Sequence, residues 1–338
     1  MGRRGLTRSS HPITFTLALV LVACGGTNTA PSTTTAAAAA ATEPEGQVVI
    51  AASPELFSSR LIADFAAKSG CHATLVPPAV DGVVPAGVDL IELRSDQVSA
   101  FTASGTTRSP AVPDSIPQSL RVPGAMPYLW EAELLAVPDG SVQRPSLRVL
   151  FAPGRSGSVA LPDSPSMLAL VARYLGAAKP FRLTAEQLAS VRRLLTLAPP
   201  RLYTSRERLQ QLFTTSTPVV VVSSAETGVI PVTQLRVPAE GSIGAVRVLL
   251  SATDSLHPQC AKAFSEYILR PEPQAALSRT SNRWPVVSSE CDPSIVDRCR
   301  FARQAQAHFI PLERPTNPDG SDDQARWVGE WTLLSRTG

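Results

Sequence analysis

Apolar and polar residues between positions 47 and 93 follow the periods of strands and one helix. The apolar run 47–53 is typical of a strand, and the segments 72–78 and 87–93 predict two more. Between the first two, apolar residues recur at helical spacing: Leu56, Leu61, Ile62, Phe65 and Ala66. Gly70 would end this helix as a C-cap glycine. Strand, helix and strand in this order indicate an α/β fold with a parallel sheet.

Start and stop signals predict two helices in the middle of the chain. Ser164 is placed as the N-cap of the first helix, with Pro165 at its first helical position and Gly176 at its end. The second helix begins at a capping box, in which Thr184 and Gln187 exchange hydrogen bonds with each other's backbone N–H groups.

The remaining pattern predicts further strands and helices up to residue 290, and no internal repeat. Residues 219–222 are four valines without polar alternation, as expected of a strand buried between helices. The other expected elements are extended segments at 126–138, 233–238 and 244–252, a short helix over 205–216, two helices within 257–287, and a cap formed by Ser95 and Asp96 after the third strand. From Cys291 onward we expect an irregular polar tail, with Trp327 and Trp331 packing on the body.

The N-terminus predicts export and attachment to a lipid. The apolar run 13–23 is shorter than the roughly 20 residues of a spanning helix, and three arginines precede it, as in a secretory signal. Residues 21–24, Leu-Val-Ala-Cys, resemble a bacterial lipobox, which implies a signal peptide at 1–23 and lipidation of Cys24. The alternative is a plain signal peptide with an incidental cysteine. Residues 24–46 are rich in Thr, Ala and Pro, and we expect a disordered tether.

Charge and cysteine content bear on nucleic-acid binding, disulfides and metal sites. The net charge is +3, but without residues 1–23 the chain has 28 basic and 28 acidic groups, which gives no support for nucleic-acid binding. Besides Cys24 there are four cysteines, and their even number in an exported chain predicts two disulfides. Of three possible pairings, the nearest in sequence is Cys291 with Cys299, which leaves Cys71 with Cys260. The histidines show no metal-ligand spacing, so we predict no metal and no cofactor.

Five stretches between residues 47 and 290 have the character of family motifs: "FAAKSG" (65–70), Pro127-Tyr128-Leu129-Trp130, the stretch from Asp163 to Gly176, the stretch from Phe264 to Glu272, and "NRWPVV" (282–287). In these motifs and in the order of its pieces, the chain resembles the extracellular solute-binding proteins of ABC importers, in the spermidine/putrescine branch. The resemblance implies a two-lobed type II periplasmic-binding fold with two hinge-crossing segments. Its divisions would be a first lobe at 47–127, a second lobe at 128–236, a return to the first at 237–290, and the tail at 291–338.

The same resemblance implies a ligand site, but one whose aromatic cage is mostly replaced. The family's ligand positions fall at Ser53, Asp96, Asp163, Ser166, Ser223, Glu226, Arg247 and Trp284. Only Trp284 keeps an aromatic side chain, and Arg247 in the cleft would repel a diamine. We therefore expect an anionic, zwitterionic or neutral ligand and weak or absent binding of spermidine and putrescine. The carboxylates of Asp96, Asp163 and Glu226 argue for a diamine instead.

Several of these residues also have purely structural interpretations. Trp130 suits packing at the hinge better than ligand contact, Asp163 can serve the first turn of its helix, and Arg247 can face solvent. The chain carries none of the common catalytic motifs, so we predict that it is not an enzyme. The predicted function is a monomeric lipoprotein on the outer face of the bacterial membrane that captures a small solute for ABC permease subunits. The alternative is a two-lobed lipoprotein that has lost its ligand and binds a protein partner.

Overall fold

The computed structural model describes residues 45–80, 82–137, 145–152, 157–216, 219–225, 230, 234–287 and 296–336. The strands within these ranges are β1 (Gln47–Ala51), β2 (His72–Val76), β3 (Leu90–Arg94), β4 (Thr107–Arg108), β5 (Met126–Trp130), β6 (Glu133–Ala136), β7 (Val159–Pro162), β8 (Arg201–Tyr203), β9 (Val219–Ser223), β10 (Leu235–Arg236), β11 (Ile243–Gly244), β12 (Val246–Ala252), β13 (Trp284–Pro285) and β14 (Ile310–Pro311). The α-helices are α1 (Ser59–Ser69), α2 (Val98–Thr102), α3 (Met167–Tyr174), α4 (Ala185–Leu197), α5 (Arg206–Ser216), α6 (Pro258–Tyr267), α7 (Pro271–Ser281), α8 (Val296–Gln306) and α9 (Gln324–Ser335). Short 3₁₀ helices are η1 (Ser95–Gln97), η2 (Gln118–Leu120) and η3 (Leu147–Phe151).

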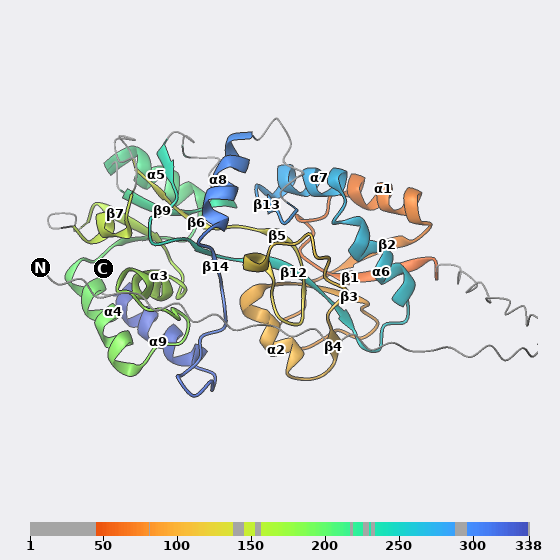
Figure 1. The fold of residues 1–338 in the computed structure, drawn as a ribbon, viewed down its shortest axis with the longest axis horizontal. Coiled ribbons are helices and arrows are strands. Elements are labelled where there is room, and N and C mark those ends of the chain that lie inside the picture. The colour runs from red at the N-terminus through yellow and green to blue at the C-terminus, as the bar shows by residue number, and fades with distance from the viewer. Residues whose placement is uncertain are drawn as a thin grey trace, which may run out of the picture. The chain divides into compact units, whose positions relative to one another are not determined.

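The first sheet has the strand order β13-β5-β12-β3-β1-β2, with β4 also paired to β12. Its β1 is parallel to β2 and β3, as the sequence pattern predicts, whereas β12 is antiparallel to β3 and β5. Figure 1 shows α1 and α7 along one side of these strands and α2 on the other. Alternate residues of β12 accordingly enter two different cores: Val246, Val248 and Leu250 on one side, and Leu249 on the other.

Local signals determine the bounds of α1. The Ser58 side chain accepts the backbone N–H of Leu61 at 3.3 Å, which caps the first turn. Gly70 has φ = 75°, and this left-handed conformation ends the helix as predicted. The helix buries Leu61 and Phe65 against α6, where Phe65 meets Phe264 edge to face.

The second sheet has the strand order β10-β6-β9-β7-β8, and helices cover both of its faces. In β9, Val220 and Val222 share a core with residues of α5, whereas Val219 and Val221 lie in the core that contains α3, α4 and α9. All four valines are almost fully buried, which confirms the interpretation of 219–222 as a strand between helices. Figure 1 shows α5 on one side of this sheet and α3, α4 and α9 on the other.

The two predicted helices of this half are present, but the first begins later than expected. The capping box of Thr184 and Gln187 is formed, and Gly176 (φ = 86°) follows the end of α3 as predicted. However, α3 begins at Met167, so the placement of Ser164 as its N-cap is wrong. The Ser164 carbonyl instead accepts the N–H of Met167, and its hydroxyl lies 2.8 Å from the hydroxyl of Ser166, which makes a separate turn before the helix.

The chain passes from the first sheet to the second between β5 and β6, at Glu131 and Ala132. The N–H of Glu131 donates to Ala245 O, and Ala132 exchanges two hydrogen bonds with Ser224 of the second half. The return passage lies between β10 and β12. Here a Cβ on Gly244 would lie 2.0 Å from Glu131 O, so only glycine lets the two passing strands approach this closely.

The expectation of an irregular segment after residue 291 is wrong, because α8, β14 and α9 are regular elements there. Strand β14 pairs in parallel with β11 beside the return passage. Trp327 and Trp331 of α9 are buried in the core of the second half, which confirms that they pack on the body. The burial of these two tryptophans stabilises α9, although the mostly polar sequence after residue 291 did not indicate a regular element there.

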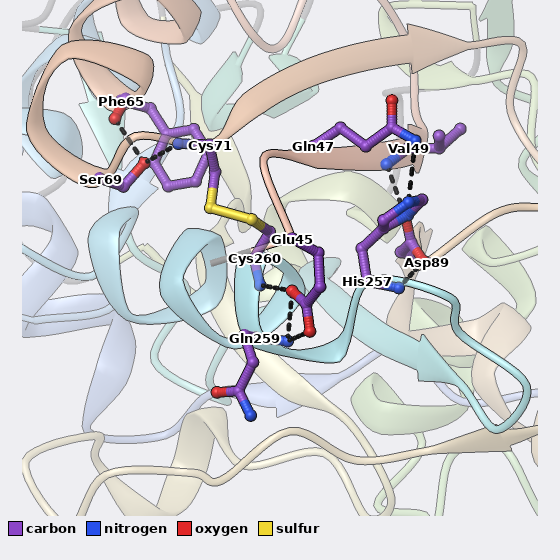
Figure 2. Close-up of a disulfide and its surroundings, with 10 residues drawn as sticks. All are labelled: Glu45, Gln47, Val49, Phe65, Ser69, Cys71, Asp89, His257, Gln259 and Cys260. Carbon is purple, nitrogen blue, oxygen red and sulfur yellow. Dashed lines mark hydrogen bonds and ion pairs between the residues drawn. A yellow bond between two sulfur atoms is a disulfide. The ribbon is translucent and has the colours of Figure 1, made fainter. Parts of the chain in front are cut away.

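A disulfide joins Cys71, which precedes β2, to Cys260 in α6, with 5.8 Å between the two Cα atoms (Figure 2). The Glu45 carboxylate accepts the N–H groups of Gln259 and Cys260 and so caps α6 next to this bond. The pairing is the one predicted for Cys71. Cys24 and Cys291 lie outside the described residues, and no side-chain position is described for Cys299, so the second disulfide stays a prediction.

Asp89 forms hydrogen bonds to three other residues of the first half, and Glu45 lies between it and the disulfide (Figure 2). Its buried carboxylate accepts the N–H groups of Val49 and His257 and the hydroxyl of Ser255, and it lies 2.9 Å from His257 Nδ1. Burial opposes the charge of Asp89, but these donors outweigh it and lower its pKa.

Among the described residues, no helix has the length and apolar character needed to cross a bilayer.

Candidate functional site

Four charged side chains meet where the chain passes between the two sheets. They are Glu92 on β3, Glu131 after β5, Arg247 on β12 and Arg283 before β13, and we call them the junction cluster. Arg247 Nη1 lies 3.2 Å from Glu92 Oε1, and Arg283 Nε lies 3.2 Å from Glu131 Oε2. The exposed fraction of the side chains is 3% for Glu92, 12% for Glu131 and 17% for each arginine, so most of their charge is removed from water.

Strand register brings Glu92 and Arg247 together. Leu249 of β12 lies opposite Glu92, and Arg247 lies opposite Arg94. Because side chains alternate along a strand, Arg247 and Leu249 point to the same face, and Arg247 reaches Glu92 diagonally. On this face Leu90 and Leu249 belong to the core under α1, α6 and α7.

Burial and mutual attraction shape the ionisation of the cluster. Burial raises the pKa of the Glu92 carboxyl above its ordinary range, although the positive charge of Arg247 opposes the shift. Burial alone would lower the pKa of Arg247, but the carboxylates of Glu92 and Glu131 outweigh it and raise that pKa, so the guanidinium stays charged. Burial, and then the charge of Glu92, raise the pKa of Tyr128 well above its usual value.

Two guanidinium nitrogens of the cluster are buried without an acceptor. Among the described residues, neither Arg247 Nε nor Arg283 Nε has a hydrogen-bond partner, although the latter lies at ion-pair distance from Glu131. The N–H of Arg283 is therefore not aligned with the carboxylate beside it. Buried donors without acceptors are uncommon in folded proteins and cost free energy.

Of the residues expected from the sequence to bind ligand, Ser223 contacts this cluster and Arg247 belongs to it, whereas Ser53 bonds to Glu55. Ser223 donates its hydroxyl to Glu131 Oε2 at 3.3 Å, and Arg247 is a member itself. Ser53 donates to Glu55 Oε1 at 2.7 Å. This hydrogen bond is the largest cause of the lowered pKa of Glu55, to which the charges of Arg247 and Arg283 contribute less.

Asp163, Ser166 and Asp96 have partners elsewhere. Asp163 Oδ1 accepts the indole N–H of Trp331 at 2.7 Å, and the Ser166 hydroxyl lies against that of Ser164. Asp96 pairs with Arg94 at 3.1 Å.

The expectation that Ser95 and Asp96 cap the following helix is wrong. Ser95 lies inside η1 and donates its hydroxyl to Leu312 O, so its side chain holds the C-terminal segment instead. The carboxylate of Asp96 is turned toward Arg94. Glu226 lies outside the described residues.

Trp130 and Trp284 pack against each other, with ring centroids 4.6 Å apart and edge to face. Trp130 donates its indole N–H to Pro285 O, and its other side meets Phe309 at 4.8 Å. This geometry agrees with the interpretation of Trp130 as a packing residue. Trp284 is 3% exposed and Ala245 is also buried, so neither offers an open surface in this structure.

Sequence reasoning did not single out Glu92, Glu131 or Arg283. Each had a signal, because each is a charged residue next to or inside an apolar run: "DLIEL" (89–93), "LWEAELL" (129–135) and "SNRWPVV" (281–287). A charged side chain that is buried together with its strand requires a partner of opposite charge, and each of these three residues has one in the folded chain. Within the described residues, no group of three or more His, Cys, Asp or Glu side chains is arranged to hold a metal ion.

A separate hollow of about 570 Å³ lies on the first half, between α6 and residues 108–113. Arg108, Lys262 and Glu266 are its charged lining residues, and the rest of the lining is mixed, with apolar groups such as Met126 and Leu269 and several serines. It shares no residue with the junction cluster.

Comparisons with known proteins identify the fold. No protein-family profile and no curated protein matches the sequence. Solved structures do match: the spermidine/putrescine substrate-binding protein PotD of Streptococcus pneumoniae (14% identity, TM-score 0.67, 85% of this chain and 97% of that one), the Tp0655 lipoprotein of Treponema pallidum (14%, 0.59, 86% and 98%), and the GacH receptor of Streptomyces glaucescens, solved also with acarbose (18%, 0.61, 86% and 92%). The chain therefore has the two-lobed α/β fold of the type II periplasmic binding proteins, as the resemblance predicted.

Proposed function

We propose that this protein is the substrate-binding component of an ABC importer, which captures a small solute between its two halves and delivers it to permease subunits. The shared fold supports this role, because the similar structures are substrate-binding proteins over nearly their whole length. They are binding proteins and not enzymes, which agrees with the absence of a catalytic motif in the sequence.

The junction cluster is the observation that carries the proposal. Arg247 and Glu92 come from the first half, Glu131 from the passage between the halves, and Ser223 from the second half. A solute bound at this place would contact both halves, and clefts between two lobes are common ligand sites. Closure of two lobes around a ligand is also a known motion of proteins with hinges.

The proposed solute is not a polyamine. Among the similar structures, one is a spermidine/putrescine substrate-binding protein and another was solved in complex with acarbose, so the fold itself does not select a ligand. In this chain position 247 of the site carries a guanidinium, which cannot pair with the amine of a diamine. The carboxylate of Asp163 is already bound to Trp331.

We also infer export and a lipid anchor. The lipobox-like residues 21–24 and the basic start of the chain support removal of residues 1–23 and lipidation of Cys24. The protein would then act as a monomer on the outer face of the bacterial membrane, held by its tether near the permease.

A thermal-shift screen of the exported chain carrying Cys24→Ser tests the function. The screen covers amino acids, organic anions, sugars and polyamines, and at least one solute should raise the melting temperature. At a hundredfold excess over its dissociation constant, a ligand stabilises the folded state by about 2.7 kcal/mol. If no solute shifts the transition, the alternative of a lipoprotein that binds a protein partner is favoured. Micromolar spermidine binding that is lost in Asp163→Asn would instead show a polyamine carrier.

A further inference from the structure

The unpaired donors of the junction cluster indicate what kind of group the site accepts. Arg247 Nε and Arg283 Nε are both buried and have no acceptor among the described residues. The two arginines flank the same strand: Arg247 lies opposite Leu129 of β5, and Arg283 directly precedes Trp284, which lies opposite Trp130. Two buried guanidinium groups whose Nε–H donors lack an aligned acceptor form a site for an anion, and a planar guanidinium matches a carboxylate especially well.

The charges within the cluster already balance in the absence of a ligand. Glu92 neutralises Arg247 and is almost fully buried beneath it, so this pair is not easily separated. Glu131 neutralises Arg283, but it is more exposed and its carboxylate is not aligned with the N–H it faces. Glu131 is therefore the member of the cluster that a ligand can replace at the smallest cost.

We propose that a carboxylate of the solute binds to Arg283 and Arg247, and that Glu131 occupies this position while the site is empty. This inference rests on the proposed function and specifies its substrate class. The carboxylate of Glu131 shows that a group of this size and charge fits beside Arg283. The Ser223 hydroxyl donates to the same Oε2 atom of Glu131 that lies beside Arg283, so a solute carboxylate in this position would also meet that hydroxyl. Glu131 then acts as an internal competitor that lowers the affinity for every acid equally.

A series of four-carbon probes tests the carboxylate requirement. Succinate has two carboxylates, γ-aminobutyrate has one, and putrescine has none, while each of the three has an unbranched chain of four carbons. Titration calorimetry and thermal shift should detect succinate or γ-aminobutyrate and not putrescine. Binding of both acids indicates a simple organic acid, whereas binding of γ-aminobutyrate alone indicates a zwitterion such as an amino acid.

Two variants test the assigned residues, and a third controls for loss of a positive charge. Glu131→Gln removes the competitor and should tighten binding of the acid probes at least tenfold. Arg283→Gln should weaken it at least tenfold. Arg193→Gln removes an exposed arginine of α4 and should change nothing. Because Arg283→Gln can affect folding, the double variant Glu131→Gln/Arg283→Gln removes both members of the pair and should also lack acid binding.

The outcomes separate this inference from the proposed function. If the acid probes bind no more tightly to Glu131→Gln than to the Arg193→Gln control, the inference is overturned. Binding of putrescine or a sugar that is unchanged in Arg283→Gln overturns it too, but leaves the solute-binding function standing. If no solute stabilises any variant, the proposed function fails as well.

Discussion

Glu92 is a carboxyl group in the middle of a buried strand, and Arg247 is its ion-pair partner. Removing two charges from water costs several kcal/mol per ion, and their attraction repays this only with good geometry. Arg247 lies 3.2 Å away, yet burial still raises the pKa of Glu92. The pair is thus better explained by the site it builds than by the stability it adds.

Replacing Arg247 by methionine should reveal this dependence. Arg247→Met leaves Glu92 buried without a counterion, and breaking a buried pair in this way costs about 3–5 kcal/mol. The loss should grow with pH. The pKa of Glu92 is higher in the folded state than its unfolded value of about 4.3. The free energy of unfolding therefore falls as the pH rises from the unfolded to the folded pKa, and removal of Arg247 raises the folded pKa further and widens this range. Urea unfolding at pH 5 and pH 8 measures both effects.

A second substitution provides the control. Adding Glu92→Gln to Arg247→Met removes the unpaired charge, so the double variant should recover much of the lost stability and show the same loss at both pH values. An equal loss at pH 5 and pH 8 in the single variant would contradict the assignment of the effect to Glu92.

These residues also show why the site was only partly predictable. Arg247 and Ser223 were named as ligand residues because the resemblance places them in the cleft, and both lie at the cluster, while their role in binding stays a prediction. Glu131 and Arg283 are 152 positions apart, and only the folded chain brings them together. A single sequence marks each as an unusual charge in an apolar run, but it does not state which charge pairs with which.

At the scale of elements, the sequence predicts best what local interactions decide. The ends of α1 and the capping box of α4 involve residues within four positions of each other. The strand β9 was recognised from its four valines because burial on both faces leaves no polar position. By contrast, α9 owes its order to distant groups, since Trp327 stacks on Phe181 and Trp331 bonds to Asp163.

The disulfide acts at the same scale, because it fixes α6 to the start of β2. Replacing both cysteines, Cys71→Ser with Cys260→Ser, should lower the free energy of unfolding by about 2–5 kcal/mol. The enclosed loop is long, with 189 positions between the cysteines, so the unfolded chain gains much freedom when the bond is absent. Denaturant titrations of both proteins, and of the wild type under reducing agent, measure the difference. Equal unfolding midpoints would contradict it.

At the scale of the whole molecule, the body begins where its tether would end. Glu45 is held at the start of α6 by the N–H groups of Gln259 and Cys260, next to the disulfide. The first described residue of the chain is thus fixed to α6 of the first half.

The predicted anchor can be tested on the full chain. Cys24→Ser removes the only thiol that the lipobox-like motif offers, so the protein should move from the membrane fraction to the soluble fraction. Thr27→Ser, three residues later, is the matched control and should stay with the membrane. Fractionation followed by immunoblotting gives the measurement. Retention of Cys24→Ser in the membrane would favour a plain signal peptide or another mode of attachment.

The Cys71–Cys260 bond has one more consequence, for the response of the protein to proteases. Every strand of the second sheet, and both passages between the sheets, lie between these two cysteines in the sequence. A protease that cuts the backbone once anywhere in this interval opens a ring and does not divide the molecule. The two fragments stay joined until a reductant reaches a bond that is fully buried. Outside the cell, a nicked protein would thus remain a single covalent molecule.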